Sequence, residues 1–165
     1  MGKLRFYHIK EEYINFLHTI DRRVQLNKGE RRPYVGVVLV ISGFSYFVPL
    51  ESPKPNHVNI RSGGPVLKLE DGRLGIMGFN NMIPAENRHL VAFDISAEKD
   101  EKYRNLLYNQ LAYCQKNYDL ILARAQSTYK KAIGGKIPLY RKVCCDFKKL
   151  EENIGLFRPK KYRAK

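Results

Sequence analysis

RRPYVGVVLVISGFSYFVPLESPKPNH, residues 31–57, is the stretch that decides the fold. Two runs rich in β-branched and aromatic residues, 35–41 and 44–50, are typical of strands on a half-buried sheet. Gly43 between them permits the positive φ of a tight hairpin turn. Residues 52–55, Ser-Pro-Lys-Pro, exclude regular structure, so polar side chains leave the second strand on a loop. The pattern predicts a rigid hairpin with functional groups at its open end.

Short strands on both sides of this hairpin indicate an antiparallel sheet. Residues 4–9 fit one strand, and residues 66–69 and 74–77 fit a second hairpin around an Asp-Gly pair, a strong turn signal. Residues 90–95 fit a further strand. Because these strands precede most of the helical sequence, the chain does not alternate as a doubly wound nucleotide-binding sheet would.

Helical periodicity begins with residues 11–24 and resumes after Ser96, a candidate cap, where apolar residues again repeat at helical spacing. The span 98–133 is long for one globular helix. We therefore expect a break near Asn117, with Asp119 capping the second part.

The carboxyl-terminal part is predicted to hold a short helix over 147–153, capped by Asp146 and closed by Gly155. Residues 158–165 contain five basic residues and no acidic one, and we interpret them as a basic tail. Runs of strands followed by runs of helices predict an α+β fold: a compact curved antiparallel β-sheet or small barrel with surrounding helices, in a single domain, 1–165.

The charge balance points to nucleic acid. The chain has 30 Lys and Arg against 16 Asp and Glu, a net charge of +14 and a pI near 9.8, which raises the local concentration of polyanions. Its three cysteines form no CxxC or CxxxC pair, which argues against a zinc or redox site and favours a reducing cytoplasm. No signal-peptide core and no run near the roughly 20 apolar residues of a membrane span is found, so we expect no membrane partner.

The two ends of the predicted hairpin return to the same place, because antiparallel strands fold back on themselves. Fixed cations, hydroxyl donors and an aromatic surface there suit a phosphodiester with an unstacked base. Glu51 beside them could form a salt bridge with a neighbouring Arg or accept a proton. The candidate catalytic residues are Arg32, Tyr34, Glu51, Ser52, Lys54 and His57, with Arg31 next to them as an RNA contact.

RNA carries its own nucleophile, the ribose 2′-hydroxyl, so a site that orients it and stabilises the charge at phosphorus can cleave RNA without a metal. Histidine titrates nearest neutral pH, which favours His57 in proton transfer, and Lys54 or Tyr34 could act as the acid. DNA lacks this hydroxyl and would resist the chemistry. We therefore expect neither a metal nor a cofactor.

Each of these residues also has a purely structural interpretation. Arg31 and Arg32 could be solvated charges at a strand start, and Tyr34 could pack on the sheet. Residues 52–55 could be a plain extended turn, and His57 an exposed loop residue. The residues alone leave these alternatives open.

Aromatic and basic side chains along the long helical region are candidates for RNA contacts. Tyrosines there could stack on bases, although core packing is the alternative for them. His8, His18 and His89 have no partner at metal-ligand spacing, and we interpret them as structural. The candidate RNA-binding residues outside the hairpin are Arg61, Tyr108, Tyr113, Lys116, Lys130 and Lys131.

A family resemblance rests on several stretches taken in order. These are K-x-R-F-Y at residues 3–7, EYINFL at 12–17, the hairpin sequence at 33–57, MIP at 82–84 and Y-x-NLLYNQLAY at 103–113. Together they resemble the ToxN/AbiQ toxins of type III toxin–antitoxin systems, and within that family the CptN-like members. The resemblance covers residues 3 to about 120 and is most specific at YFVPLESPK followed by NH.

This resemblance implies a metal-independent endoribonuclease on a compact curved sheet like that of the MazF and Kid toxins. It implies cellular mRNA substrates, commonly cut at adenine-rich sites, and products with a 2′,3′-cyclic phosphate. It also implies an antitoxin that is RNA and not protein: a small pseudoknot, cut from a repeated precursor, that binds a positively charged groove and alternates with the toxin in a closed ring. A cytoplasmic location fits these partners.

The active-site positions of the family carry over in part. Ser52 and Lys54 match directly, whereas Glu51 stands where other members have Thr. Arg32 stands in place of a Lys, which keeps the charge but makes proton transfer by that residue implausible. Two other interpretations remain: a non-catalytic basic RNA-binding module, and a metal-dependent nuclease, for which the acidic residues are too scattered.

Overall fold

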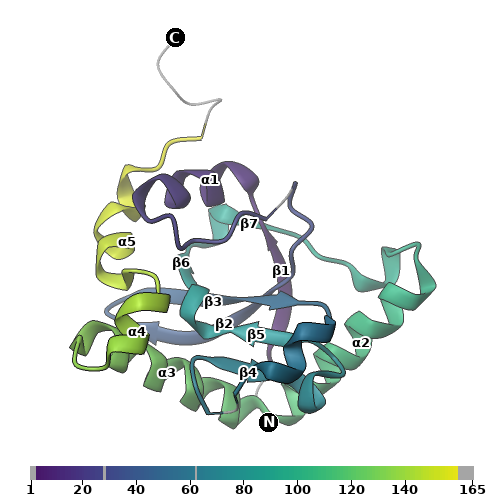
Figure 1. The fold of residues 1–165 in the computed structure, drawn as a ribbon. Coiled ribbons are helices and arrows are strands. Elements are labelled where there is room, and N and C mark those ends of the chain that lie inside the picture. The colour runs from purple at the N-terminus through teal and green to yellow at the C-terminus, as the bar shows by residue number, and fades with distance from the viewer. Residues whose placement is uncertain (1–2, 28, 62, 160–165) are drawn as a thin grey trace.

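Seven antiparallel strands form the centre of the structure, a computed structural model that describes residues 3–27, 29–61 and 63–159 (Figure 1). The sheet runs in the order β4-β5-β3-β2-β1-β7, and β6 pairs with β3 beside this path. In chain order the strands are β1 (Arg5–Ile9), β2 (Tyr34–Ile41), β3 (Phe44–Glu51), β4 (Val66–Lys68), β5 (Ile76–Gly78), β6 (Ile83–Ala85) and β7 (Leu90–Val91). The expected α+β fold with an antiparallel sheet is confirmed.

The β2–β3 hairpin forms as expected and lies in the middle of the sheet. Its register runs from Tyr34 opposite Pro49 to Ile41 opposite Phe44, with an irregularity after Gly36. A Cβ on Gly36 would lie 2.2 Å from the ring of Phe47, so glycine is required for this ring to cross β2.

Helices lie on both sides of the strands. In Figure 1, α1 lies above the strands, α5 to their left, α3 below them and α2 at the lower right. The helices are α1 (Glu11–Ile20), α2 (Glu101–Lys116), α3 (Tyr118–Gly134), α4 (Pro138–Val143) and α5 (Phe147–Asn153). Among the described residues, none of these helices has the length and apolar character to cross a membrane.

A buried polar network joins the sheet to two helices. The hydroxyls of Tyr46 and Tyr129 donate to the same carboxylate oxygen of Glu151, at 2.5 and 2.7 Å. Phe147 stacks on Tyr129 at 5.5 Å between ring centroids. Since all three aromatic residues are buried, β3, α3 and α5 are held in one arrangement.

Several element boundaries differ from the expectations. The first helix ends at Ile20 and not at residue 24, and the strand expected over 90–95 is only Leu90–Val91. The helix α4 and the strand β6 were not expected, because each is short and contains a proline.

The caps also differ in part. The side chain of Asp100 caps α2 by accepting from the Tyr103 N–H, so Ser96 is not the cap. The break near Asn117 is confirmed, but Asn117 itself, not Asp119, is the N-cap residue of α3.

At the carboxyl-terminal end, Asp146 caps α5 as expected, through the Lys149 N–H. Instead of closing at Gly155, the chain continues in a 3-10 turn, Ile154–Leu156. Of the expected basic tail, residues 160–165 lie outside the described residues.

Candidate active site

The two ends of the central hairpin meet in a pocket of about 250 Å³, which we call the phosphate pocket. Arg31, Arg32, Glu51, Ser52 and Lys54 all line it. The first two residues precede β2 and the last three end or follow β3, so the convergence expected from the sequence is present.

A backbone hydrogen bond holds the two ends together. The Leu50 N–H donates to the Pro33 carbonyl at 2.9 Å, which clamps the segment before β2 against the last residues of β3. Arg32 is therefore fixed next to Glu51 and Ser52 by the backbone and not only by side-chain contacts.

The neighbouring strand fixes the end of β3 from the other side. Glu51 pairs with Ile76 of β5, and the preceding Gly75 approaches so closely that a Cβ would lie 1.9 Å from the Glu51 carbonyl oxygen. Gly75 also has a φ of +101°, which L side chains rarely adopt. The position of Ser52 depends on this contact, because Ser52 directly follows Glu51.

Charge in the phosphate pocket is organised around Glu51. Its Oε1 lies 2.6 Å from Lys54 Nζ. Burial alone would raise the pKa of Glu51, but the hydrogen bond and charge of Lys54, with His57 and Arg32, outweigh it and hold the pKa below its ordinary value. Glu51 is therefore a carboxylate at neutral pH.

Arg32 presents an unsatisfied donor. Its Nε is buried and has no hydrogen-bond partner among the described residues. A buried donor without a partner costs about 1–3 kcal/mol, and an anionic oxygen would remove that cost. Arg32 is thus suited to hold a phosphate.

His57 is buried next to the pocket residues Lys54 and Glu51 and is not an exposed loop residue. It is 3% exposed, within the 3-10 turn Pro55–Asn59. Its Nδ1 accepts the backbone N–H of Lys54 at 3.2 Å, so neutral His57 carries its proton on Nε2, 3.7 Å from Glu51 Oε1. His57 therefore orients Lys54 and Glu51 and does not line the pocket.

Tyr34 is placed differently from the expectation. Its side chain is 1% exposed, and burial raises its pKa. It packs in the core at the start of β2 and does not line the phosphate pocket, so the geometry gives it no contact with a bound phosphate.

Comparison with known proteins extends the resemblance beyond the hairpin. The profile of a family described as "Toxin ToxN, type III toxin-antitoxin system" matches residues 5–155. The chain belongs to this family.

Relatives support the assignment to the ToxN family. The chain is 36% identical over 158 residues to endoribonuclease ToxN of Bacillus thuringiensis subsp. kurstaki, covering 90% of this chain and 81% of the relative. It is 30% identical over 168 residues to endoribonuclease AbiQ of Lactococcus lactis subsp. lactis, covering 95% and 91%.

Solved structures give the same result. One described as "selective toxin inhibition by a non-coding RNA pseudoknot" is 33% identical, with a TM-score of 0.80 over 98% of this chain and all of that one. Another, of "AbiQ, a lactococcal anti-phage endoribonuclease", is 30% identical, with a TM-score of 0.82 over 94% and 98%. The likeness to ToxN-family structures therefore extends past residue 120, where the stretches recognised in the sequence ended.

Two pocket residues of this ToxN-family chain were not expected. Tyr103, in the first turn of α2, and Asn27, whose Nδ2 donates to the Ile9 carbonyl at 2.6 Å, both line the phosphate pocket. Tyr103 begins the Y-x-NLLYNQLAY stretch, which was the only sequence signal for it.

The candidate RNA-binding residues outside the hairpin are not brought together at the pocket. Arg61 is exposed after the turn Pro55–Asn59, and Tyr108 is 45% exposed on α2, whereas Tyr113 is half-buried. Lys116, Lys130 and Lys131 are exposed at the ends of α2 and α3.

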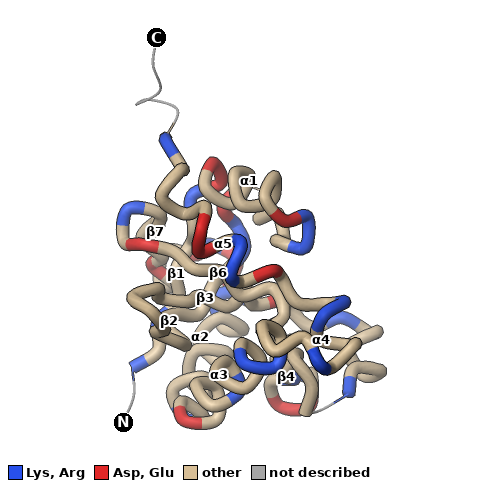
Figure 2. The backbone as a smooth tube through the Cα atoms, turned by 90° about the vertical axis from the view of Figure 1, so that its left-hand side faces the viewer, with Lys and Arg blue, Asp and Glu red and all other residues tan. Residues whose placement is uncertain are grey.

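Basic positions are spread over several elements. Figure 2 shows Lys and Arg on α4 and α5. A cavity of about 320 Å³ beside these helices is lined by Arg23, Arg141 and Lys148. These three residues were not candidates from the sequence, because they are far apart along the chain and come together only through the packing of helices.

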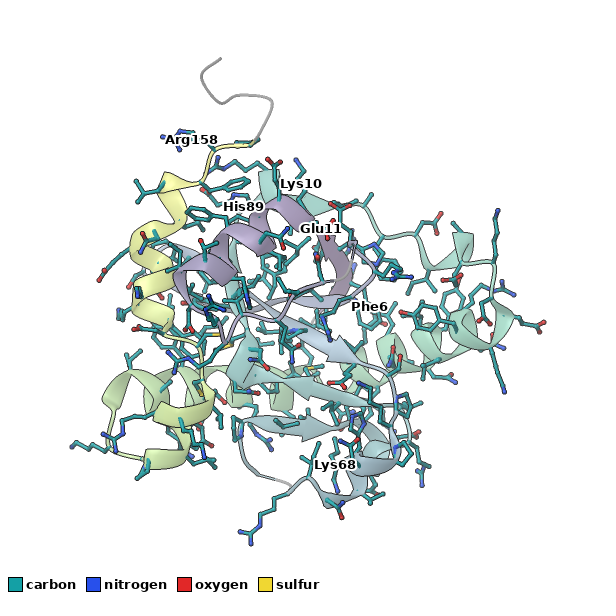
Figure 3. All side chains as sticks on the ribbon, turned by 45° about the horizontal axis from the view of Figure 1, so that its top comes forward. Phe6, Lys10, Glu11, Lys68, His89 and Arg158 are labelled. Atoms are coloured by element: carbon teal, nitrogen blue, oxygen red, sulfur yellow. The ribbon has the colours of Figure 1, made fainter. Side chains whose placement is uncertain are left out.

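The other three histidines each contact a neighbouring ring or a backbone group. His8 stacks on Phe93, and His18 Nδ1 is 2.7 Å from the Val24 carbonyl. His89 stacks on Tyr13 at 3.6 Å between ring centroids. Its carbonyl accepts the Lys10 N–H, and the two labelled residues lie close together in Figure 3. In the described part of the chain, no group of three or more His, Cys, Asp or Glu is arranged to hold a metal ion.

Proposed function

We propose that this protein is the endoribonuclease toxin of a type III toxin–antitoxin system. It cleaves single-stranded RNA by attack of a ribose 2′-hydroxyl, without a metal. The observation that carries this proposal is the phosphate pocket, in which Arg31, Arg32, Ser52 and Lys54 converge beside an ionised Glu51.

In the proposed reaction, the 2′-oxygen forms a bond to phosphorus and the bond from phosphorus to the 5′-oxygen breaks. Arg32 and Lys54 bind the phosphate oxygens and stabilise the second negative charge that develops on them. The Ser52 hydroxyl donates to one of these oxygens. The products are a 2′,3′-cyclic phosphate and a 5′-hydroxyl.

Two protons have to move. Glu51 is ionised and lies in the pocket, so it accepts the proton of the 2′-hydroxyl. Lys54, at 2.6 Å from Glu51, supplies the proton for the leaving 5′-oxygen. His57 keeps both side chains in place and is a positioning residue.

The antitoxin in this proposal is a small RNA pseudoknot, as in the relative whose structure describes selective inhibition by such an RNA. The net charge of +14 supports an RNA partner. Arg61, Tyr108, Tyr113, Lys116, Lys130 and Lys131 are the proposed RNA contacts outside the pocket, and toxin and RNA alternate in a closed ring. The site of action is the cytoplasm, where both RNAs are found.

The test is cleavage of single-stranded RNA by purified protein in EDTA. Discrete cuts with 2′,3′-cyclic phosphate ends are expected. The variants Ser52→Ala and Lys54→Ala should each lose most of the activity, whereas Lys102→Ala, an exposed lysine outside the pocket, should cut at the parental rate.

Three outcomes would separate the alternatives. Full activity of both pocket variants would refute the site. RNA that is bound but left intact would support a binding module without catalysis. Loss of cutting in EDTA, with recovery on addition of Mg²⁺, would support a metal-dependent nuclease.

A further inference from the structure

A second pocket of about 840 Å³ adjoins the phosphate pocket. The two pockets share Arg31, Ser52 and Tyr103. A group bound in the second pocket is therefore within one nucleotide of a phosphate held by Ser52. The volume of the second pocket is in the range of pockets that enclose nucleoside-sized ligands.

The second pocket lies between the sheet and the segment that connects β7 to α2. This segment extends away from the strands (Figure 1) and contributes Phe93, Asp94, Glu98 and Lys99 to the lining. His8 of β1 also lines this pocket, in contact with Phe93.

Aromatic surface is available on two sides of this pocket. Phe93 stacks on His8 with 3.9 Å between ring centroids and 28° between planes, which fixes both rings. Tyr103 is half-buried on the side shared with the phosphate pocket. An unstacked base gains affinity from such rings, because every base has a π-face.

Two carboxylates, Asp94 and Glu98, line the pocket together with the cations of Arg31 and Lys99. Asp94 uses Oδ1 to accept from the N–H and hydroxyl of Ser96, at 3.0 and 2.6 Å. Glu98 uses Oε2 to accept from the Asp100 N–H at 3.1 Å. The other oxygens, Asp94 Oδ2 and Glu98 Oε1, have no hydrogen bond to any described residue. The hydrogen bonds at Asp94 Oδ1 and Glu98 Oε2 hold each carboxylate in place.

We infer that this second pocket, the base pocket, binds the base next to the scissile phosphate and selects bases that carry an exocyclic amino group. The inference rests on the proposed function, because the shared residues place the pocket beside the phosphate that is cut. Adenine, cytosine and guanine can donate an amino hydrogen to Asp94 or Glu98. Uracil presents carbonyl oxygens at the corresponding positions, which would face the carboxylate oxygens and repel them.

Binding of uncleavable dinucleotides tests this inference without any need for catalysis. The probes are 2′-O-methyl dinucleotides, UpN and NpU, in which N is adenine, cytosine, guanine or uracil. Each has one phosphate, which fixes its register on the pockets. Isothermal titration should show that an amino-bearing base at one of the two positions binds about tenfold tighter than uracil there.

A matched pair of variants separates base selection from general charge. Glu98→Ala removes an acceptor of the base pocket, and Glu101→Ala removes an exposed carboxylate of α2 outside it. Glu98→Ala should reduce the affinity advantage of an amino-bearing base over uracil to about twofold or less, whereas Glu101→Ala should keep this advantage. If Glu98→Ala instead weakens all dinucleotides equally, its role is structural and the inference fails.

Cleavage of a random single-stranded RNA gives the second readout. Sequencing of the cut ends should show a preference at one position next to the cut, and Glu98→Ala should flatten that position alone. If the base preference next to the cut survives in both Glu98→Ala and Asp94→Asn, the inferred base pocket is wrong, although the proposed nuclease activity still stands. Conversely, a parent protein that does not cut would refute the proposed function, and the dinucleotide titration would still decide the base pocket.

Discussion

Gly75→Ala is expected to disable the phosphate pocket without changing any side chain that lines it. The new Cβ would lie 1.9 Å from the Glu51 carbonyl oxygen, whereas ordinary contacts begin at 3.4 Å, so the end of β3 must move by about 1.5 Å. Displacements near 1 Å in a catalytic site can cost about 100-fold in rate. Because Glu51 and Ser52 both move, we expect kcat/KM to fall by about 100-fold or more.

The same substitution also strains the backbone, since an L residue is forced to the φ of +101°. This strain costs about 1–3 kcal/mol, which corresponds to a decrease in Tm of roughly 2–12 °C for a chain of this size. The assay is cleavage of single-stranded RNA at a temperature at which circular dichroism shows that parent and variant are folded. A folded variant that cuts at the parental rate would refute the idea that Gly75 sets the position of Ser52.

Two other glycines provide controls for the Gly75 experiment. In Gly36→Ala the Cβ would lie 2.2 Å from the Phe47 ring, so the sheet should lose stability with a much smaller loss of activity in the folded protein. In Gly134→Ala, at the end of α3, nothing lies within 4 Å of the added Cβ, so neither property should change.

Shifted pKa values lead to three further expected outcomes. Burial raises the pKa of Cys114 to about 12 and of Cys144 to about 11, so a thiol reagent should label these residues far more slowly in the native than in the unfolded protein; rapid native labelling would contradict this. Burial and the charge of Arg88 lower the pKa of His89 to about 4, against 6.5 when unfolded. The unfolded state thus binds a proton first, and the native state should lose up to about 3 kcal/mol between pH 6.5 and 4 in urea titrations, a loss that His89→Asn should abolish. Because the pKa of Glu51 is lowered, the acidic limb of kcat/KM should lie below the ordinary carboxyl range and should disappear in Glu51→Gln; a limb near pH 6.5 would point to another base.

The meeting of Arg32 and Ser52 in the phosphate pocket could be predicted from the sequence because both residues flank one hairpin. Two β-rich runs and a glycine turn determine that Arg32 and Ser52 meet, and these signals are local. The same reasoning predicted the break near Asn117 and the cap at Asp146, which also depend on a few adjacent residues.

The placement of Tyr34 and Tyr103 could not be predicted in this way. Tyr34 begins a strand whose first residues are buried on both faces, since both Tyr34 and Val35 are nearly inaccessible, so alternation does not tell which face meets the pocket there. Tyr103 reaches the pocket through the docking of α2, more than fifty residues from the hairpin. Contacts of this kind depend on packing between elements, for which the chain carries no local signal.

The charges of the two pockets determine which way a nucleotide can bind. In the phosphate pocket, the cations of Arg31, Arg32 and Lys54 face the single carboxylate of Glu51. This excess of two positive charges matches the two negative charges of a five-coordinate phosphorus intermediate. In the base pocket, the carboxylates of Asp94 and Glu98 offset the cations of Lys99 and the shared Arg31, so no excess positive charge remains. A phosphate is therefore attracted more strongly to the first pocket than to the second, while an amino-bearing base can donate to the carboxylates of the second, so a nucleotide bound in reverse is disfavoured.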